Sequence, residues 1–589
     1  MTTDPASART QPEPDEESVR AALRDSFGVE GVLTRLDGEH DLNWRVDSAD
    51  GTYVARLSGH PGAIEAHEFQ AALLAHIHRV DAGIRIPVPL EAHRGGTSAD
   101  LTIAGRDWRL RLFTFVPGRA LRHAGRSPEL LRSVGRFMGR LSVAMRGFGH
   151  PGAHQANPLW NLDNAGARFE LIDFIEPPDV RACVERAAER WRRNVEPVLP
   201  SLPAAVVHHD ANDDNVLVES RDGEYRIGLV DFGDAVFARR INELAVALAY
   251  ALMDVRDITA AARAVIGGYT SVHPLMAEEL AVLFDLVAAR LAMSLCISFK
   301  RRIDNPGNAY LQVSQQQAAG LLGRLQALNP QFAACIARAA GGHLAVASRE
   351  AVVSYLSARS GTFQSVFNFD LHAAPRTLVS LDRNSPGMEH ADDPVAYGRW
   401  LDERMRETGA RYAIGLYAER RDCYTSPQFE SETGGQRRSV HLGIDLFVPA
   451  GTPVRSPLPG RVLSAQDNDA PLDYGTTIIL EHRCGPDGPS FCTLYGHLSR
   501  ASLRMVSAGM NVEAGQTIGE TGTHEENGGW TPHLHFQVIT DMLGESGNFH
   551  GAGEPDNMDV WEAICPDPNL ILGLVPETFE PDLPSPEAL

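Results

Sequence analysis

The period of the hydrophobic pattern changes along this chain of 589 residues, and that change most limits how the chain can fold. Between about residues 128 and 345, apolar residues recur at helical spacing in long runs rich in Ala, Leu and Arg. Beyond about residue 410, short alternations such as "HLGIDLFV", "TTIILEH" and "HLHFQVI" are separated by Gly, Pro and Thr. The change predicts a helical region followed by an all-β domain, and the length allows two to four domains.

The remaining segments complete this organisation. Within about residues 20–120, "LNWRVDS", "TYVARLS" and "LTIAGRDWRLRLFTF" predict strands, and "AIEAHEFQAALLAHIHRV" predicts a helix between them. Residues 346–410 connect the two regions; there "SVFNFDL" predicts a strand and "DPVAYGRWLDERMRET" a helix with an Asp N-cap. We expect residues 1–19 to be a disordered lead and 571–589 an extended tail.

The composition disfavours some partners and compartments. A net charge of −22 disfavours nucleic acid, because phosphate backbones are bound by basic surfaces. The stretch "ELAVLFDLVAARLAMSLCISF" is interrupted by Asp285 and Arg290, so it predicts a core helix and no membrane contact. The N-terminus lacks the apolar core of a secretory signal, and the seven cysteines form no CxxC pair. We therefore expect a cytoplasmic protein.

A polar loop between two apolar segments provides the first candidate site. The stretch "VVHHDANDDNVLV" covers residues 206–218, and "YRIGLVDFGDAVFARR" follows it. An Asp/Asn-rich surface turn is one interpretation. The other is phosphoryl transfer, which needs a carboxylate to orient the attacking hydroxyl and oxygen ligands for Mg²⁺. Asp210 fits that base and Asn215 and Asp231 fit the metal ligands. His208 supports the loop and is also a candidate for binding the cofactor, and Asp234 offers an extra contact.

The spacing H-x-D-x4-N, followed sixteen residues later by D-F-G-D, resembles the aminoglycoside phosphotransferase and choline kinase family, and within it hydroxylysine kinase-like proteins. The resemblance implies a bilobal α+β kinase-like fold, with an N-lobe over residues 20–120 and a helical C-lobe over 121–345. It also implies ATP or GTP with Mg²⁺, and an amino alcohol or hydroxy-amino acid as substrate. A protein kinase is disfavoured, because the helical run "RINELAVALAYALM" leaves no room for an activation segment.

The front region departs from this family at one position. Where the family has a phosphate-contacting lysine, "YVARLS" has Arg56, and Lys300 is the only lysine of the chain. Arginine keeps the charge and binds phosphate, although its planar head is not equivalent to an ammonium. Its helix partner would be Glu68, or Glu65 one turn earlier. The turn "DGEHDLN" (37–43), which ends at the nucleotide-binding candidate Asn43, would cover the phosphates.

Two acidic neighbours in the loop allow two interpretations. Asp213 and Asp214 are either a solvated turn or a pair that attracts a cationic amine substrate. The segment "FVPGRAL" would carry the nucleotide hinge.

A second candidate site lies in the β-rich region. Because strand side chains alternate between faces, His441, Gly443 and Asp445 of "HLGIDLF" share one face, as do His533 and His535 of "HLHFQV". Two imidazoles and one carboxylate form a catalytic zinc set that leaves a fourth position for water. The strand "FCTLYGHL" brings a further histidine at position 497.

These elements, in this order, resemble the lysostaphin-like metallopeptidases, which are zinc enzymes with an antiparallel all-β fold. The resemblance covers residues 411–570 and implies that His441, Asp445 and His535 bind zinc. It also implies that His533 and His497 are unliganded, activating the water and stabilising the oxyanion. The expected substrate is a small peptide or amide, or cell-wall peptide if the chain is exported.

The order of the two regions resembles the front of fusion proteins that continue into a class III aminotransferase domain with pyridoxal phosphate. Lys300 lies in the helical lobe, so we expect no pyridoxal phosphate here, but a separate pyridoxal-phosphate lyase is an expected partner. The leading interpretation is a bifunctional kinase and zinc hydrolase. The alternative is a binding or scaffold protein in which one or both sites are inactive.

Overall fold

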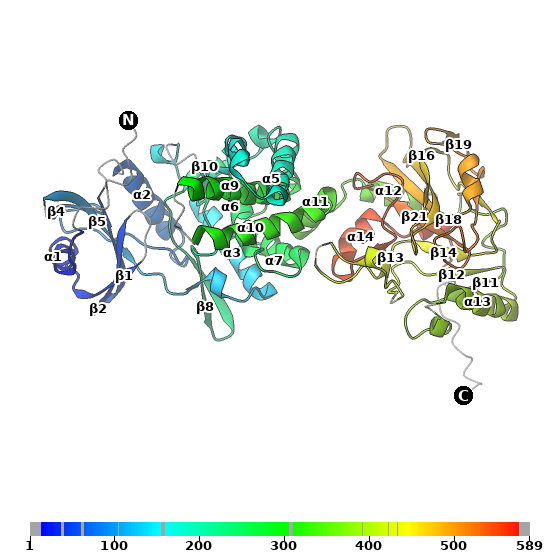
Figure 1. Cartoon of the computed structure of the whole chain (residues 1–589), viewed down its shortest axis with the longest axis horizontal. Helices are drawn as coiled ribbons and strands as arrows, with labels where there is room; N and C mark the ends of the chain where they lie inside the picture. The colour runs from blue at the N-terminus through cyan, green and yellow to red at the C-terminus, as the bar shows by residue number, and fades with distance from the viewer. Residues whose placement is uncertain are drawn as a thin grey trace. The chain divides into compact units, whose positions relative to one another are not determined.

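The computed structural model divides the chain into two compact units, residues 1–326 and 327–589 (Figure 1). The structure describes residues 13–36, 41–59, 64–103, 105–154, 159–304, 310–390, 393–421, 423–432 and 434–575. Residues 37–40 of the predicted phosphate turn, the first twelve residues of the predicted lead and residues 576–589 of the predicted tail lie outside these ranges.

The first unit begins with an antiparallel five-stranded sheet of order β1-β2-β3-β5-β4. Its strands alternate inward and outward residues, so Trp44 and Val46 of β2 and Ala55 and Leu57 of β3 enter one core. The elements of this lobe are α1 Glu16–Phe27, β1 Gly31–Leu36, β2 Leu42–Ser48, β3 Gly51–Ser58, α2 Ile64–Val80, β4 Ala99–Ile103 and β5 Arg106–Thr114. The predicted strands and helix of this lobe are confirmed.

The rest of the first unit is mostly helical, with two small sheets carrying the polar loop. Strand β7 pairs with β10, and β8 lies between β6 and β9. The strands are β6 Arg119–Ala120, β7 Ala204–Val207, β8 Val216–Arg221, β9 Glu224–Leu229 and β10 Val236–Arg239. The helices are α3 Pro128–Met145, α4 Ala165–Arg168, α5 Pro178–Arg190, α6 Ile241–Ala251, α7 Ile258–Thr270, α8 Ala277–Ala281, α9 Leu283–Asp304 and α10 Tyr310–Ala327. No helix in the described part of the chain is both long and apolar enough to cross a bilayer.

The second unit is built on an eight-stranded sheet of order β11-β12-β14-β21-β18-β17-β16-β19. Only the pair β11–β12 is parallel in this sheet, within the described residues. Its strands are β11 Arg376–Val379, β12 Tyr412–Gly415, β14 Ile444–Phe447, β16 Gly460–Asn468, β17 Gly475–Arg483, β18 Ser490–Leu498, β19 Asn511–Val512 and β21 His533–Ile539. Two small pairs join β13 Val440–His441 with β22 Ala552–Gly553 and β15 Pro453–Arg455 with β20 Thr517–Glu520. The predicted strand-rich antiparallel domain is confirmed.

Helices also belong to the second unit, and they correct several predictions. They are α11 Pro330–Ala340, α12 Arg349–Ser357, α13 Pro394–Thr408, α14 Met558–Ile564 and α15 Asn569–Leu572. The predicted Asp N-cap is confirmed, since Asp393 accepts from the backbone N–H groups of Val395 and Ala396. The expected strand "SVFNFDL" is wrong: Phe367 makes an isolated bridge to Val454 and is buried in the core. The region 411–570 is also not purely β, because α14 and part of α15 lie within it.

The boundaries at residues 19 and 345 are also corrected. Helix α1 begins at Glu16, inside the predicted disordered lead, because Asp15 caps it and accepts from the N–H of Ser18. Helix α11 belongs to the second unit and not to the helical lobe. Its Phe332 stacks on Trp561 with ring centroids 4.5 Å apart. Helical periodicity shows that a face is buried, but it does not show which core receives that face.

We expect a fragment of residues 327–589 to be more stable than one of residues 346–589. The shorter fragment loses the buried side chains of Phe332 and Ile336 and uncovers Trp561. Burial of each such side chain contributes roughly 1.5–3 kcal/mol, so we expect a loss of about 4 kcal/mol in the free energy of unfolding. Urea unfolding measures the difference, with Phe332→Ala in the longer fragment as the matched variant. Equal stabilities would contradict the assignment of α11.

Candidate functional sites

The polar loop after β7 is held by buried groups. The backbone N–H of His208 donates to Glu243 Oε2 on α6 over 2.6 Å. His208 Nδ1 accepts from the N–H of Asp210 at 3.2 Å, so the proton is on Nε2, which lies 3.2 Å from the carbonyl oxygen of Val230. Burial lowers the pKa of His208 to about 4, which keeps this ring neutral. The ring is fully buried, a position suited to supporting the loop rather than to contacting a nucleotide.

Asp210 is the centre of a hydrogen-bonded cluster. Its Oδ2 accepts from Asn212 Nδ2 at 3.0 Å and from Asn215 Nδ2 at 2.8 Å. Its Oδ1 accepts from Arg290 Nη2 at 2.8 Å. Burial, together with the nearby carboxylates of Asp234 and Asp231, raises the pKa of Asp210 to about 7 against the opposing charge of Arg290. These acidic groups are therefore close enough to interact.

The two predicted magnesium ligands lie at the ends of adjoining segments. The carbonyl oxygen of Asn215 accepts from the N–H of Val230 at 3.0 Å, which holds Asp231 beside the loop. The amide nitrogen of Asn215 donates to Asp210, so its Oδ1 is the side-chain atom left to bind a cation. Asp231 has a left-handed backbone with a φ of 61°, and its side chain is 53% exposed. The exposed carboxylate is thus available to a ligand.

Arg56, Asn43 and Asp231 line one cleft of about 270 Å³. Arg56 faces Asn43 across the β2–β3 pair, and its Nη1 lies 3.9 Å from Asp231 Oδ1. Glu68 is exposed, and among the described residues the ion pair of Arg56 is with Asp231 and not with Glu68 or Glu65. The pairing of Arg56 with the helix therefore stays a prediction.

The structure also adds residues that the motif did not include. Arg290 of α9 is 1% exposed, and its guanidinium lies 4.8 Å from the ring of Trp160. Arg111 of β5, which faces Arg56 in the β3–β5 register, donates to Gln70 Oε1 at 2.8 Å and to Asp41 Oδ2 at 2.7 Å. No spacing in the sequence marks these residues, because each reaches its partner across 41 to 80 residues.

The acidic pair in the loop has its own basic partner. Arg122 contacts Asp214 directly and lies 3.8 Å from Asp213. Asp213 is buried, so it is not a freely solvated turn residue. The guanidinium offsets part of the negative charge that was expected to attract an amine.

In the second unit, strand pairing brings the predicted zinc ligands together. Asp445 of β14 lies opposite His535 of β21 in the antiparallel register. The expected continuous strand from His441 to Asp445 is wrong, because β13 ends at His441 and β14 begins at Ile444. Gly443 lies in the break, where a Cβ would approach His535 Cε1 to 2.5 Å. Glycine there leaves room for the imidazole.

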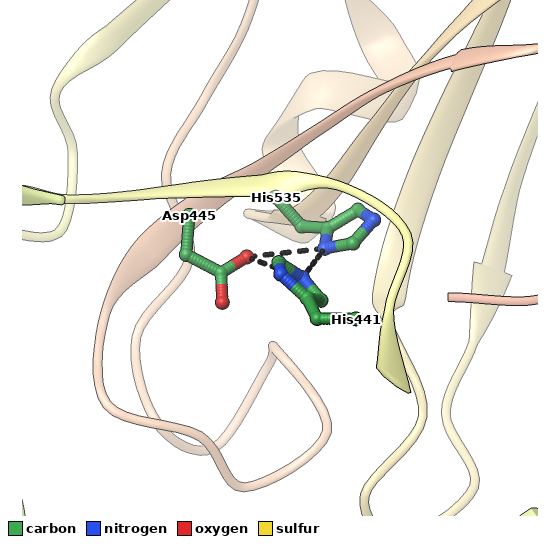
Figure 2. Close-up of side chains that lie close together, drawn as sticks. All are labelled: His441, Asp445 and His535. Carbon is green, nitrogen blue, oxygen red and sulfur yellow. Dashed lines mark hydrogen bonds and ion pairs between the residues drawn. The ribbon is translucent and has the colours of Figure 1, made fainter. Parts of the chain in front are cut away.

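The three side chains converge on one another (Figure 2). His441 Nε2 lies 3.0 Å from His535 Nδ1 and 3.3 Å from Asp445 Oδ1, and His535 Nδ1 lies 3.1 Å from the same oxygen. All three are at most 3% exposed. His441 Nδ1 faces the carbonyl oxygen of Leu416 at 2.9 Å, and His535 Nε2 faces Gln537 Oε1 at 2.9 Å.

Those outer hydrogen bonds determine what the centre can hold. An imidazole nitrogen beside a carbonyl oxygen donates its proton, so the inner nitrogens of both rings carry lone pairs. Two lone pairs and a carboxylate facing one another repel unless a cation lies among them. Burial opposes the charge on Asp445, yet the neighbouring guanidinium of Arg421 helps to hold the pKa of its carboxyl well below the usual value. This donor set fits Zn²⁺.

Two further histidines flank this centre. The rings of His497 and His533 have centroids 4.1 Å apart. His497 Nδ1 lies 2.9 Å from the carbonyl oxygen of Asn527, and His533 Nδ1 lies 2.6 Å from that of Thr531. Their Nε2 atoms are the remaining lone-pair nitrogens, and His533 Nε2 is 3.7 Å from Asp445 Oδ1. Burial lowers the pKa of both rings, so both are neutral bases.

Comparison with known families gives one match in each unit. Residues 32–278 match the Phosphotransferase enzyme family, and residues 439–546 match Peptidase family M23. The chain therefore carries a phosphotransferase-type kinase domain followed by an M23 peptidase domain, and both are families of enzymes. The predicted fold class, kinase-like α+β followed by a strand-rich peptidase domain, is confirmed.

Individual relatives extend this result. The chain is 28% identical to hydroxylysine kinase of Mus musculus over 202 residues, which is 33% of this chain and 54% of that protein. It is 25% identical to hydroxylysine kinase of Danio rerio over 54% of this chain and 92% of that protein. The chain is also 36% identical over 99 residues to the DD-carboxypeptidase/endopeptidase Mpg of Neisseria meningitidis, which is 17% of this chain and 20% of that protein. The chain thus spans about half the length of the first relative and a fifth of the last.

Proposed function

We propose that this protein is a bifunctional enzyme that phosphorylates the hydroxyl group of a small amino alcohol or hydroxy-amino acid and hydrolyses a peptide or amide bond. The observation that carries the first activity is the Asp210 cluster beside Asn215 and the exposed Asp231. The one that carries the second is the convergence of His441, Asp445 and His535 on one point.

In the kinase site, Asp210 accepts the proton of the substrate hydroxyl, and Arg290 and Asn215 orient its two carboxylate oxygens. Asn215 Oδ1 and Asp231 would hold Mg²⁺, which would offset the negative charge of the nucleotide phosphates. Arg56 and Asn43 line the cleft proposed for ATP or GTP. Similarity to hydroxylysine kinases supports an amino-alcohol substrate.

In the hydrolase site, His441, Asp445 and His535 would hold Zn²⁺, which lowers the pKa of a bound water and polarises the scissile carbonyl. His497 and His533 present neutral Nε2 atoms that accept and return the proton of the attacking water. The similarity to an endopeptidase favours a peptide substrate, with cell-wall peptide as one source. Location in the cytoplasm would favour a small peptide or amide instead.

Two experiments test the pair of activities on the full chain. A panel of amino alcohols and hydroxy-amino acids with labelled ATP or GTP identifies the phosphate acceptor, and zinc content per chain tests the metal centre. Turnover at neither site would favour the alternative, a binding or scaffold protein. A phosphorylated amino alcohol as product would make a separate pyridoxal-phosphate lyase the expected next enzyme.

We expect Arg56→Met to lower kcat/KM for the nucleotide by about 100-fold, because the variant removes the cleft's charge for the phosphates. Arg56→Lys keeps a charge and should retain more activity than the methionine variant. Steady-state kinetics at varied nucleotide concentration measure the effect. The control is Arg20→Gln, which removes an exposed ion pair between Arg20 and Glu16 on α1. Full activity of Arg56→Met would exclude Arg56 from nucleotide binding.

A further inference from the structure

A buried arginine adjoins the carboxylate of the metal centre. Arg421 is 3% exposed, and its Nη1 donates to Asp445 Oδ2 at 2.6 Å. The other oxygen, Oδ1, is the one near His441 and His535. The two oxygens of a single carboxylate therefore have separate neighbours, the guanidinium on one side and the imidazoles on the other.

Arg421 is itself fixed by other groups. Its Nε lies 3.1 Å from Glu419 Oε2, and its Nη1 also donates to the hydroxyl oxygen of Tyr424 at 3.0 Å. Glu419 Oε1 in turn accepts from Ser380 Oγ at 2.7 Å and from the N–H of Leu381 at 3.1 Å. The guanidinium is thus tied to the segment that follows β11 as well as to its own.

A glycine makes room for this arrangement. Gly415 of β12 lies opposite Asp445 of β14 in the antiparallel register. A Cβ at position 415 would lie 3.0 Å from Arg421 Nη2 and 3.2 Å from Asp445 Cβ, closer than ordinary van der Waals contact. A side chain there would push the guanidinium away from the carboxylate without changing any charge.

The charge balance argues against a role in stability alone. Buried ion pairs contribute little to folding stability, because the desolvation cost offsets their attraction. Here two buried carboxylates, Glu419 and Asp445, face one guanidinium, which leaves a net negative charge among neutral imidazoles. A divalent cation at the imidazole side compensates that charge.

We propose that Arg421 is a positioning residue that occupies Asp445 Oδ2, so that Oδ1 stays aimed at the metal held with His441 and His535. This inference rests on the proposed zinc site and deepens it. Hydrogen-bonded partners of metal ligands typically change metal affinity by about 10- to 100-fold when they are removed. Charge alone predicts the opposite sign, because removing a nearby cation would strengthen the binding of Zn²⁺. The sign of the effect therefore separates positioning from simple electrostatics.

The test is the zinc affinity of full-length variants, measured by competition with a chromogenic chelator. We expect Arg421→Gln to weaken zinc binding by about 10- to 100-fold, and Arg421→Lys and Gly415→Ala to weaken it less. The absorption spectrum of the cobalt-substituted protein should also change in Arg421→Gln, since a freed Oδ2 alters coordination. Arg461→Gln, which breaks an exposed pair with Glu481 in the same domain, is the matched control and should change neither readout.

The outcomes separate the inference from the function on which it rests. Wild-type protein without zinc would overturn both. Zinc binding by the wild type with equal or tighter binding by Arg421→Gln would overturn the positioning role alone. If Arg421→Gln does not fold, Gly415→Ala decides the matter, because it displaces the same guanidinium while keeping the charges; unchanged affinity and spectrum in that variant would also overturn the inference.

Discussion

Replacing Asp210 with asparagine is expected to lower the rate of phosphoryl transfer by about 10³-fold, the middle of the range for loss of a general base. The amide cannot accept the proton of the substrate hydroxyl. The nitrogen of the new amide would also face another hydrogen-bond donor in either orientation. At the position of Oδ1 it would meet Arg290 Nη2, and at the position of Oδ2 it would meet the side-chain amides of Asn212 and Asn215. We expect the loss to appear in kcat, with KM for the nucleotide little changed, because Arg56 and the cleft are untouched.

The measurement is single-turnover transfer of labelled phosphate to the acceptor found in the substrate panel. Asp222→Asn is the matched control: it makes the same chemical change in the exposed turn between β8 and β9. Circular dichroism and the unfolding midpoint of both variants show whether the fold is kept. A folded Asp210→Asn protein with wild-type transfer would remove Asp210 as the base.

Replacing His441 with alanine is expected to abolish stoichiometric zinc binding and hydrolysis, while leaving phosphoryl transfer intact. The variant removes one of three donor atoms and also the hydrogen bond to the Leu416 carbonyl that orients the ring. Loss of an outer partner alone costs about 10- to 100-fold in metal affinity, so loss of a direct ligand should exceed about 100-fold. Metal analysis after dialysis and a chelator titration measure the affinity.

Removing the metal from the wild type with a chelator should reproduce the loss of hydrolysis, and added zinc should restore it. His390→Ala, an exposed histidine in the same unit, is the control. Full zinc content in a folded His441→Ala variant would show that the metal is bound elsewhere. Hydrolysis that survives the chelator would contradict the zinc mechanism even if His441 proves necessary.

Much of each candidate site could be predicted from local spacing. Asp210 and Asn215 lie five residues apart in one turn, and His533 and His535 lie on one strand, so short-range geometry brings these side chains together. Hydrophobic period likewise predicted β2, β3 and α2 closely. The same signals were insufficient at α11. The helical period of this segment was predicted correctly, but the helix packs in the second unit and not in the helical lobe.

By itself, the amino-acid sequence determined the two kinds of domain and their order, because the motifs of each depend on residue types at short, regular separations. Only the tertiary structure decided which basic groups hold the acidic ones. Arg290 reaches Asp210 across 80 residues and Arg421 reaches Asp445 across 24, through strand register and helix packing. No local period encodes such contacts, since an arginine inside an apolar helix or beside a strand has the same sequence pattern whether its partner is solvent or a buried carboxylate.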